Sequence, residues 1–155
     1  MPATFHCNQL KKLVVLTWLM LCNMAKTIDV VGAVFMRRGK VFAAQRGAGK
    51  AMAGMWEFPG GKIEEGESPQ QALAREIREE LLVDAVIGAR LTTTAHDYDF
   101  GTVNLTTYLC AIDEAAEPVL TEHQDARWVT IAELNQLDWA PADIPAVKLL
   151  ISGGY

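Results

Sequence analysis

A helix with two chemically different faces is the feature that most limits how this chain can fold. Ser68 can cap the helix, Pro69 suits its first position, and Gln71 completes a capping box. The pattern predicts a helix that runs to about Leu81. At about 100° per residue, one arc of this helix is apolar and must face a core, and its members are Leu73, Ala74, Ile77 and Leu81.

The adjoining arc of the same helix carries three glutamates, Glu76, Glu79 and Glu80. Carboxylates at these spacings repel one another by roughly a few tenths of a kcal/mol per close pair. By the same angular count Arg75 and Arg78 point elsewhere, so no basic side chain is expected to offset the repulsion. The arc is therefore either a solvated acidic face or a site for a hard divalent cation with oxygen ligands, such as Mg²⁺.

The patterns on either side of the helix predict a layered α+β domain. Gly47–Gly61 contains five glycines and one proline, which predicts a long loop. Alternating or β-branched residues predict strands at 28–36, 41–45, 90–98, 102–112 and 126–129. A capping box at Thr130 and Glu133 opens a second helix, and a last helix is expected at 144–151.

Length and charge narrow the classes of function. A chain of 155 residues, half of them hydrophobic, fits one globular domain that needs no disulfide or structural metal to fold. The net charge of −5 argues against a nucleic-acid partner, because it offers no general attraction to a phosphate backbone. Three cysteines without a C-x-x-C pair suit a reducing cytosol, so a cytoplasmic location is expected.

Residues 1–24 differ from the rest. The apolar run 13–21 follows two lysines but is too short to span a bilayer, which takes about 20 residues. We expect residues 1–24 to be a dispensable extension or a mis-assigned start, with Met24 as the alternative start. A signal or anchor and a structural element are the other interpretations. The domain is expected at 25–155, without a membrane partner.

The acidic helix and the loop before it carry one long motif. The pattern G-x5-E-x7-R-E-U-x-E-E-x-G-U, with U aliphatic, is matched by Gly61, Glu67, Arg75, Glu76, Ile77, Glu79, Glu80 and Val83. At usual residue frequencies the chance of this match at one start is below about 10⁻⁸. The motif resembles the Nudix box, and the segments 44–46 and 55–62 resemble the MutT-type branch of that family. The resemblance spans about residues 28–150.

The resemblance implies a mixed β-sheet layered between helices, an α/β/α sandwich. It also implies a Mg²⁺-dependent hydrolase, with Mn²⁺ as a substitute, that cuts a nucleoside triphosphate to the monophosphate and pyrophosphate. The enzyme would act as a monomer or a homodimer. A dinucleotide or ADP-ribose pyrophosphatase is the alternative, as is a non-catalytic module that binds a nucleotide or damaged DNA.

By resemblance, the metal ligands are Glu79 and Glu80, with Glu76 as a third and catalytic ligand and the Gly60 carbonyl as a fourth. Glu67 is expected to pair with Arg75 and so orient the helix. The sequence departs from the box at one position, since Leu82 replaces its last glycine. A left-handed residue there costs a non-glycine about 1–2 kcal/mol, so either Leu82 is strained or the helix ends differently.

The other expected site residues lie outside the helix. Arg46 and Lys62 are the expected phosphate contacts, although Arg46 also fits an ordinary solvated strand end. Glu122 is the expected general base, and its alternative is a surface charge. Asp143 is expected to read the base of an oxidised purine, as in 8-oxo-dGTP, or of a cytosine nucleotide. The alternative for Asp143 is a cap on the last helix.

Overall fold

The computed structural model describes residues 26–155. The expected N-terminal extension, with its apolar run at 13–21, lies outside the described residues. Among the residues described, no helix is long and apolar enough to cross a membrane.

Strands, helix, strands and helices follow one another in the order expected. The elements are β1 (Thr27–Arg37), β2 (Lys40–Gln45), β3 (Trp56–Glu57), β4 (Gly60–Lys62), α2 (Pro69–Leu81), β5 (Val86–Tyr98), β6 (Gly101–Ala111), β7 (Asp125–Thr130), the 3₁₀ helix η1 (Ile131–Gln136) and α3 (Ile144–Ser152).

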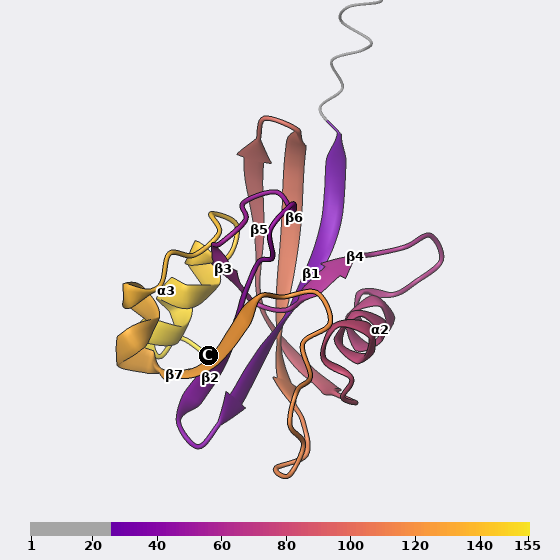
Figure 1. The fold of residues 1–155 in the computed structure, drawn as a ribbon. Coiled ribbons are helices and arrows are strands. Elements are labelled where there is room, and N and C mark those ends of the chain that lie inside the picture. Colours follow the sequence, from indigo (N-terminus) through magenta and orange to yellow (C-terminus); the bar gives the residue numbers. More distant parts are fainter. Residues whose placement is uncertain (1–25) are drawn as a thin grey trace, which may run out of the picture.

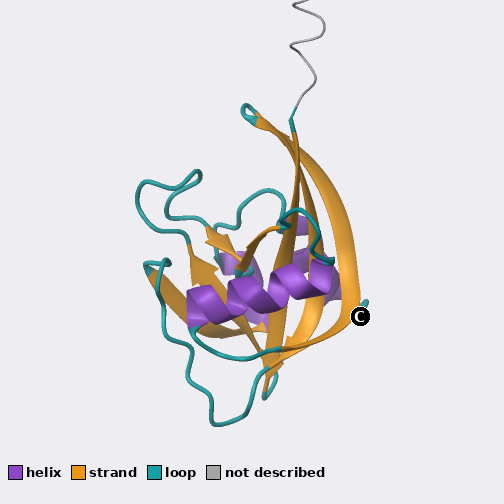
Figure 2. Ribbon diagram, turned by 90° about the vertical axis from the view of Figure 1, so that its right-hand side faces the viewer, coloured by secondary structure: helices purple, strands orange, loops and turns teal. Residues whose placement is uncertain are grey.

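Within residues 26–155, seven strands form one mixed sheet built around β1. Strand β1 runs parallel to β6 over most of its length and pairs antiparallel with β4 through Val30–Gly32. Near its end it turns back into β2, which pairs with β3 and β7. Helix α2 lies on one side of this sheet and α3 with η1 on the other (Figures 1 and 2). The predicted mixed sheet between helices, an α/β/α sandwich, is confirmed.

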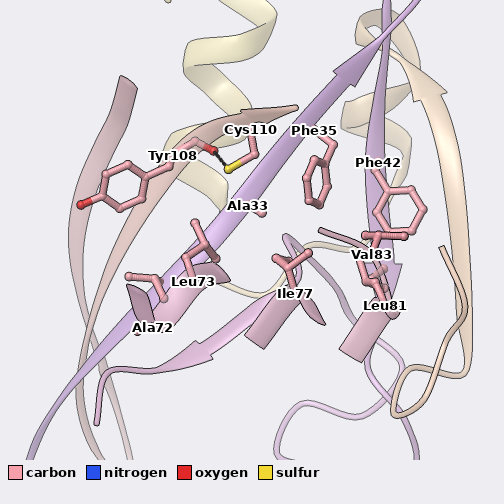
Figure 3. Packing of buried hydrophobic residues seen from close by; sticks show 12 residues of the cluster. Ala33, Phe35, Phe42, Ala72, Leu73, Ile77, Leu81, Val83, Tyr108 and Cys110 are labelled. Carbon is pink, nitrogen blue, oxygen red and sulfur yellow. Dashed lines mark hydrogen bonds between the residues drawn. The ribbon is translucent and has the colours of Figure 1, made fainter. Parts of the chain in front are cut away.

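Two apolar cores hold these layers together, and β1 contributes to both. Val31, Ala33 and Phe35 point towards α2, whereas Val34, between them in sequence, points towards α3. This two-residue alternation is what a strand buried on both faces requires. The core under α2 contains Leu73, Ile77 and Leu81 together with Phe42, Tyr108 and Cys110 (Figure 3). The helix is thereby fixed firmly to the sheet.

Helix α2 begins as predicted. Ser68 Oγ accepts from the Gln71 N–H at 3.2 Å, and the Gln71 side chain accepts from the Ser68 N–H at 2.9 Å. The apolar stripe is shifted slightly, because Ala72 is buried while Ala74 is only half-buried. The expectation that Ala74 faces the core was therefore wrong.

Three other boundaries also differ from the prediction. The segment 47–61 is not all loop, since β3 lies within it and β4 begins at its end. These strands are two and three residues long and are held mainly by neighbouring strands, so they leave almost no periodic pattern. Strand β5 starts at Val86 and not at residue 90, and the helix after Thr130 is a short 3₁₀ helix.

Leu82, which replaces the last glycine of the motif, is strained, as one of the two alternatives predicted. It ends α2 in the left-handed conformation, with φ 54° and ψ 33°, and its side chain is 60% exposed. A leucine there crowds its Cβ against the backbone and gains little burial in return.

We predict that Leu82→Gly stabilises the protein by about 0.5–1 kcal/mol, because relief of the left-handed strain exceeds the extra entropy of the unfolded chain. Leu82→Ala is the matched control, since it shortens the side chain but keeps the strained backbone. Urea unfolding measures both variants. Equal stability of the glycine and alanine variants would contradict the assignment of strain.

Candidate active site

Two glycines bring the backbone of β4 directly against α2. A Cβ on Gly60, whose φ is 154°, would lie 2.1 Å from the Val31 carbonyl oxygen. A Cβ on Gly61 would lie 2.4 Å from the carboxyl carbon of Glu76. The Gly60 N–H donates to Glu80 Oε2 at 3.2 Å. Only glycines allow this approach, and the approach places two box glutamates beside the turn.

Arg75 contacts three carboxylates beside this turn. Its Nε donates to Glu67 Oε1 at 2.7 Å and its Nη2 to Glu67 Oε2 at 2.9 Å. Its Nη1 donates to Glu76 at 2.8 Å and to Glu79 at 3.4 Å. The expectation that Arg75 points away from the acidic arc was wrong, because the angular count places the Cβ atom and ignores the reach of a long side chain.

Arg75 pairs with Glu67, as the resemblance to the motif implied, and the pair has two hydrogen bonds. The hydrogen bonds from Arg75 lower the pKa of Glu67 to about 2, and the same contacts raise the pKa of Arg75. Arg75 Nη2 also donates to the Lys62 carbonyl at 3.1 Å. The loop before α2, strand β4 and the helix thus share one guanidinium group.

The three arc glutamates occupy different environments. Glu80 is buried, and burial raises its pKa to about 7. Glu76 is half-buried against Gly61, whereas Glu79 is 60% exposed. Among residues 26–155, no three carboxylate, histidine or cysteine groups form a ready metal cluster. The donors nevertheless suit a hard cation, because the carboxylate of Glu80 is buried without a cationic partner in the described chain.

A second group of charged side chains comes from the loop after β2, from β3 and from the segment before β7. Arg46 contacts Glu57 through Nη1 and donates from Nε to the Ala51 carbonyl at 2.7 Å. Glu57 also contacts the buried His123, with 3.0 Å between Oε1 and Nε2. Glu122, which also lines the cleft, pairs with Lys50, and this pair lowers the pKa of Glu122.

The far end of the site is apolar apart from one buried acid. Tyr98 and Phe100 stack with ring centroids 5.1 Å apart, and the Tyr98 hydroxyl accepts from the Ala142 N–H at 3.0 Å. Asp143 stands at the start of α3 but makes no side-chain cap there. Its Oδ1 instead accepts from the buried Phe58 N–H at 3.0 Å, and burial raises its pKa to about 8. The capping alternative for Asp143 was therefore wrong.

One cleft of about 610 Å³ joins these parts. It is lined by most of the residues that the sequence singled out, namely Arg46, Gly60, Lys62, Glu76, Glu80, Glu122 and Asp143. Glu67, Arg75 and Glu79 are not among its lining residues, but Arg75 connects Glu67 and Glu79 to Glu76, which lines the cleft.

Sequence reasoning missed several contributors to the cleft. Glu57 and Lys50 line it, as do Tyr98 and Phe100 from the β5–β6 hairpin. Glu57 directly precedes the Phe-Pro-Gly-Gly segment and could have been noted there. The two aromatic residues gave no signal, because aromatic side chains at a hairpin tip fit many functions.

Comparison with known proteins agrees with this geometry. The NUDIX domain family matches residues 26–150. The CTP pyrophosphohydrolase of Escherichia coli (strain K12) is 38% identical over 127 residues, which cover 82% of this chain and 93% of that protein. The 8-oxo-dGTP diphosphatase of the same strain is 32% identical over 128 residues, which cover 82% of this chain and 98% of the relative.

A solved structure of a Nudix family protein is also similar to this chain. The chain is 49% identical to the DNA mismatch repair protein MutT from methicillin-resistant Staphylococcus aureus 252, with a TM-score of 0.70. The similarity covers 84% of this chain and 100% of that chain. The motif on α2, the layered sheet and these relatives together establish that the chain belongs to the Nudix hydrolase family.

Proposed function

We propose that this protein is a Mg²⁺-dependent nucleoside triphosphate pyrophosphohydrolase that releases the monophosphate and pyrophosphate. We place it in the cytoplasm, with an oxidised purine or a cytosine nucleotide as substrate. Hydrolysis of an oxidised nucleotide would remove it from the pool used for DNA synthesis. The relatives named for CTP and for 8-oxo-dGTP support both substrate classes.

The observation that carries the proposal is the division of the cleft into an acidic and an apolar end. Glu76 and Glu80 lie beside the glycine turn, whereas Tyr98 stacks on Phe100 and contacts the Ala142 N–H, next to Asp143. A volume of about 610 Å³ is in the range of cofactor and nucleotide sites. A nucleotide can thus place its phosphates at the acidic end and its base against the aromatic side chains.

Nudix hydrolases generally use a divalent metal. In this chain Glu76, Glu79, Glu80 and the Gly60 carbonyl would hold Mg²⁺, or Mn²⁺ in its place. When bound, the ion would neutralise the charge that develops on the phosphate oxygens. Glu67 would act indirectly, by keeping Arg75 oriented beside Glu76.

The chain's own side chains supply the remaining steps. Arg46 and Lys62 would bind the phosphate oxygens of the nucleotide at the acidic end of the cleft. Glu122, kept ionised by Lys50, would accept the proton of the attacking water. The water oxygen then forms a bond to phosphorus, the anhydride bond breaks, and the pyrophosphate leaves with its electron pair.

Asp143 is proposed to read the base. An ionised carboxylate only accepts hydrogen bonds, which from sequence alone favours a donor-rich base edge. With a pKa of about 8, however, the buried carboxyl keeps its proton near neutral pH and can donate as well. This property fits either substrate class, and the amide of an asparagine would reproduce only part of it.

A panel of nucleoside triphosphates assayed with Mg²⁺ tests the function. We expect monophosphate and pyrophosphate as products, with CTP or 8-oxo-dGTP giving the highest kcat/KM. Excess EDTA should abolish turnover. Release of single phosphate groups, full activity in EDTA, or preference for ADP-ribose or a dinucleotide would overturn the proposal. Binding of nucleotide without turnover would instead point to the non-catalytic module.

We predict that Glu79→Gln lowers kcat by about three decades, or about 4 kcal/mol, because a metal ligand loses its charge. The free energy of unfolding of the metal-free variant should differ from that of the parent by less than about 0.5 kcal/mol, since Glu79 is exposed and its ion pair with Arg75 is long. The matched control is Glu114→Gln, an exposed glutamate that pairs with Arg38. A Glu79 variant with a lower melting temperature but an unchanged kcat would contradict the metal-binding role and show that Glu79 only stabilises the helix.

We predict that Asp143→Asn changes the ranking of substrates by about 1–3 kcal/mol in kcat/KM, because a permanent donor and acceptor replaces a carboxyl. If every substrate falls by one common factor, the base is read elsewhere.

The same variant also has a pH signature. The Asp143 carboxyl loses its proton near pH 4 in the unfolded chain but only near pH 8 in the folded protein. Between these two pH values the folded protein therefore holds one more proton than the unfolded chain. The stability contributed by neutral Asp143 is therefore full at low pH and is lost as the pH rises through this window. Asp143→Asn should gain stability relative to the parent as the pH rises, measured by urea unfolding of metal-free protein.

A further inference from the structure

A buried histidine stands behind the wall of the cleft, on the segment that also carries Glu122. The His123 side chain is 2% exposed and is not among the residues lining the cleft. Its Nε2 lies 3.0 Å from Glu57 Oε1, and its Nδ1 is buried without a hydrogen-bond partner among the described residues. Because an ionised carboxylate only accepts, Nε2 is the nitrogen that donates.

Glu57 connects His123 to Arg46. One oxygen of Glu57 accepts from His123, and the other contacts Arg46 Nη1. Glu57 and Arg46 both line the cleft, and their side chains are 15% and 21% exposed. We call these residues the His–Glu–Arg chain. Its charged members are largely shielded from water, so their mutual orientation is set by these contacts.

The Arg46 guanidinium is held at two of its three nitrogens. Nη1 contacts Glu57 and Nε donates to the Ala51 carbonyl at 2.7 Å. Within residues 26–155, Nη2 makes no hydrogen bond. This arrangement leaves one pair of N–H donors for an anion in the cleft while fixing the plane of the group.

The backbone around His123 is equally constrained. The Gln124 N–H donates to the Gln45 carbonyl at 3.0 Å, and a Cβ on Gly47 would lie 2.8 Å from the Glu122 carbonyl oxygen. Thr121 donates to the Glu79 and Glu80 carbonyls at the end of α2. His123 therefore lies on a segment that is hydrogen-bonded both to the end of α2 and to the end of β2, next to Arg46.

We propose that His123 is a positioning residue that orients Arg46 for phosphate binding through Glu57, an inference that rests on the proposed function. Loss of the histidine frees one oxygen of Glu57, and the carboxylate can then turn and draw the guanidinium out of register with the phosphates. The main effect falls on phosphate affinity and KM, and a smaller effect falls on kcat.

The test measures binding of inorganic pyrophosphate with Mg²⁺ by titration calorimetry, and kcat and KM with CTP. We expect His123→Leu to weaken pyrophosphate binding about tenfold. His123→Gln, whose amide can still donate to Glu57, should lose less than about threefold. Glu57→Gln should weaken binding in the same direction and keeps the assay informative where the leucine variant does not fold.

A double-mutant cycle separates positioning from general support of the fold. In an Arg46→Ala background, His123→Leu should change pyrophosphate affinity by less than about twofold, because its target is gone. An equal loss in both backgrounds, or unchanged binding by all three single variants, overturns the inference. The proposed function fails separately, if the parent protein neither binds pyrophosphate nor turns over any nucleotide of the panel.

Discussion

The contact between the Arg75 guanidinium and its surrounding carboxylates is the interaction on which the rest of the site depends. One cation lies against Glu67, Glu76 and Glu79 and also binds the Lys62 carbonyl. It offsets a repulsion that the helix would otherwise carry alone. It also ties β4 to α2, so that the glycine turn lies within reach of Glu76 and Glu80. A metal ion bound there would share these carboxylates with a partner that is already in place.

The sheet delivers the other half of the site. Strand β1 pairs with β4 and with β6, and the hairpin that β6 shares with β5 carries Tyr98 and Phe100. The glycine turn and the aromatic residues thus meet across one strand, although they lie some forty positions apart in sequence. Asp143 completes this end through its bond to the Phe58 N–H, which joins the start of α3 to the loop before β4.

How much of this could be predicted depended on whether a signal was local. Ser68, Gln71 and the apolar stripe specified α2 because capping and periodicity act within a few residues. The resemblance of the motif to the Nudix box implied the pairing of Glu67 with Arg75, which the structure contains. The contact of Arg75 with Glu76 and Glu79 was missed, since side-chain reach does not follow from helical angle. The short strands β3 and β4, the contact of Asp143 with the Phe58 N–H and the burial of His123 depend on tertiary neighbours, which no local pattern records.

Binding of Mn²⁺ is the most direct measurement of the central claim, that the helix and the glycine turn form one cation site. Titration of nucleotide-free protein, followed by electron paramagnetic resonance, gives the affinity without any catalytic step. We expect Glu76→Gln and Glu80→Gln each to weaken Mn²⁺ binding by at least about tenfold, while Glu114→Gln leaves it unchanged. Equal Mn²⁺ affinity in all three variants and the parent would contradict the account.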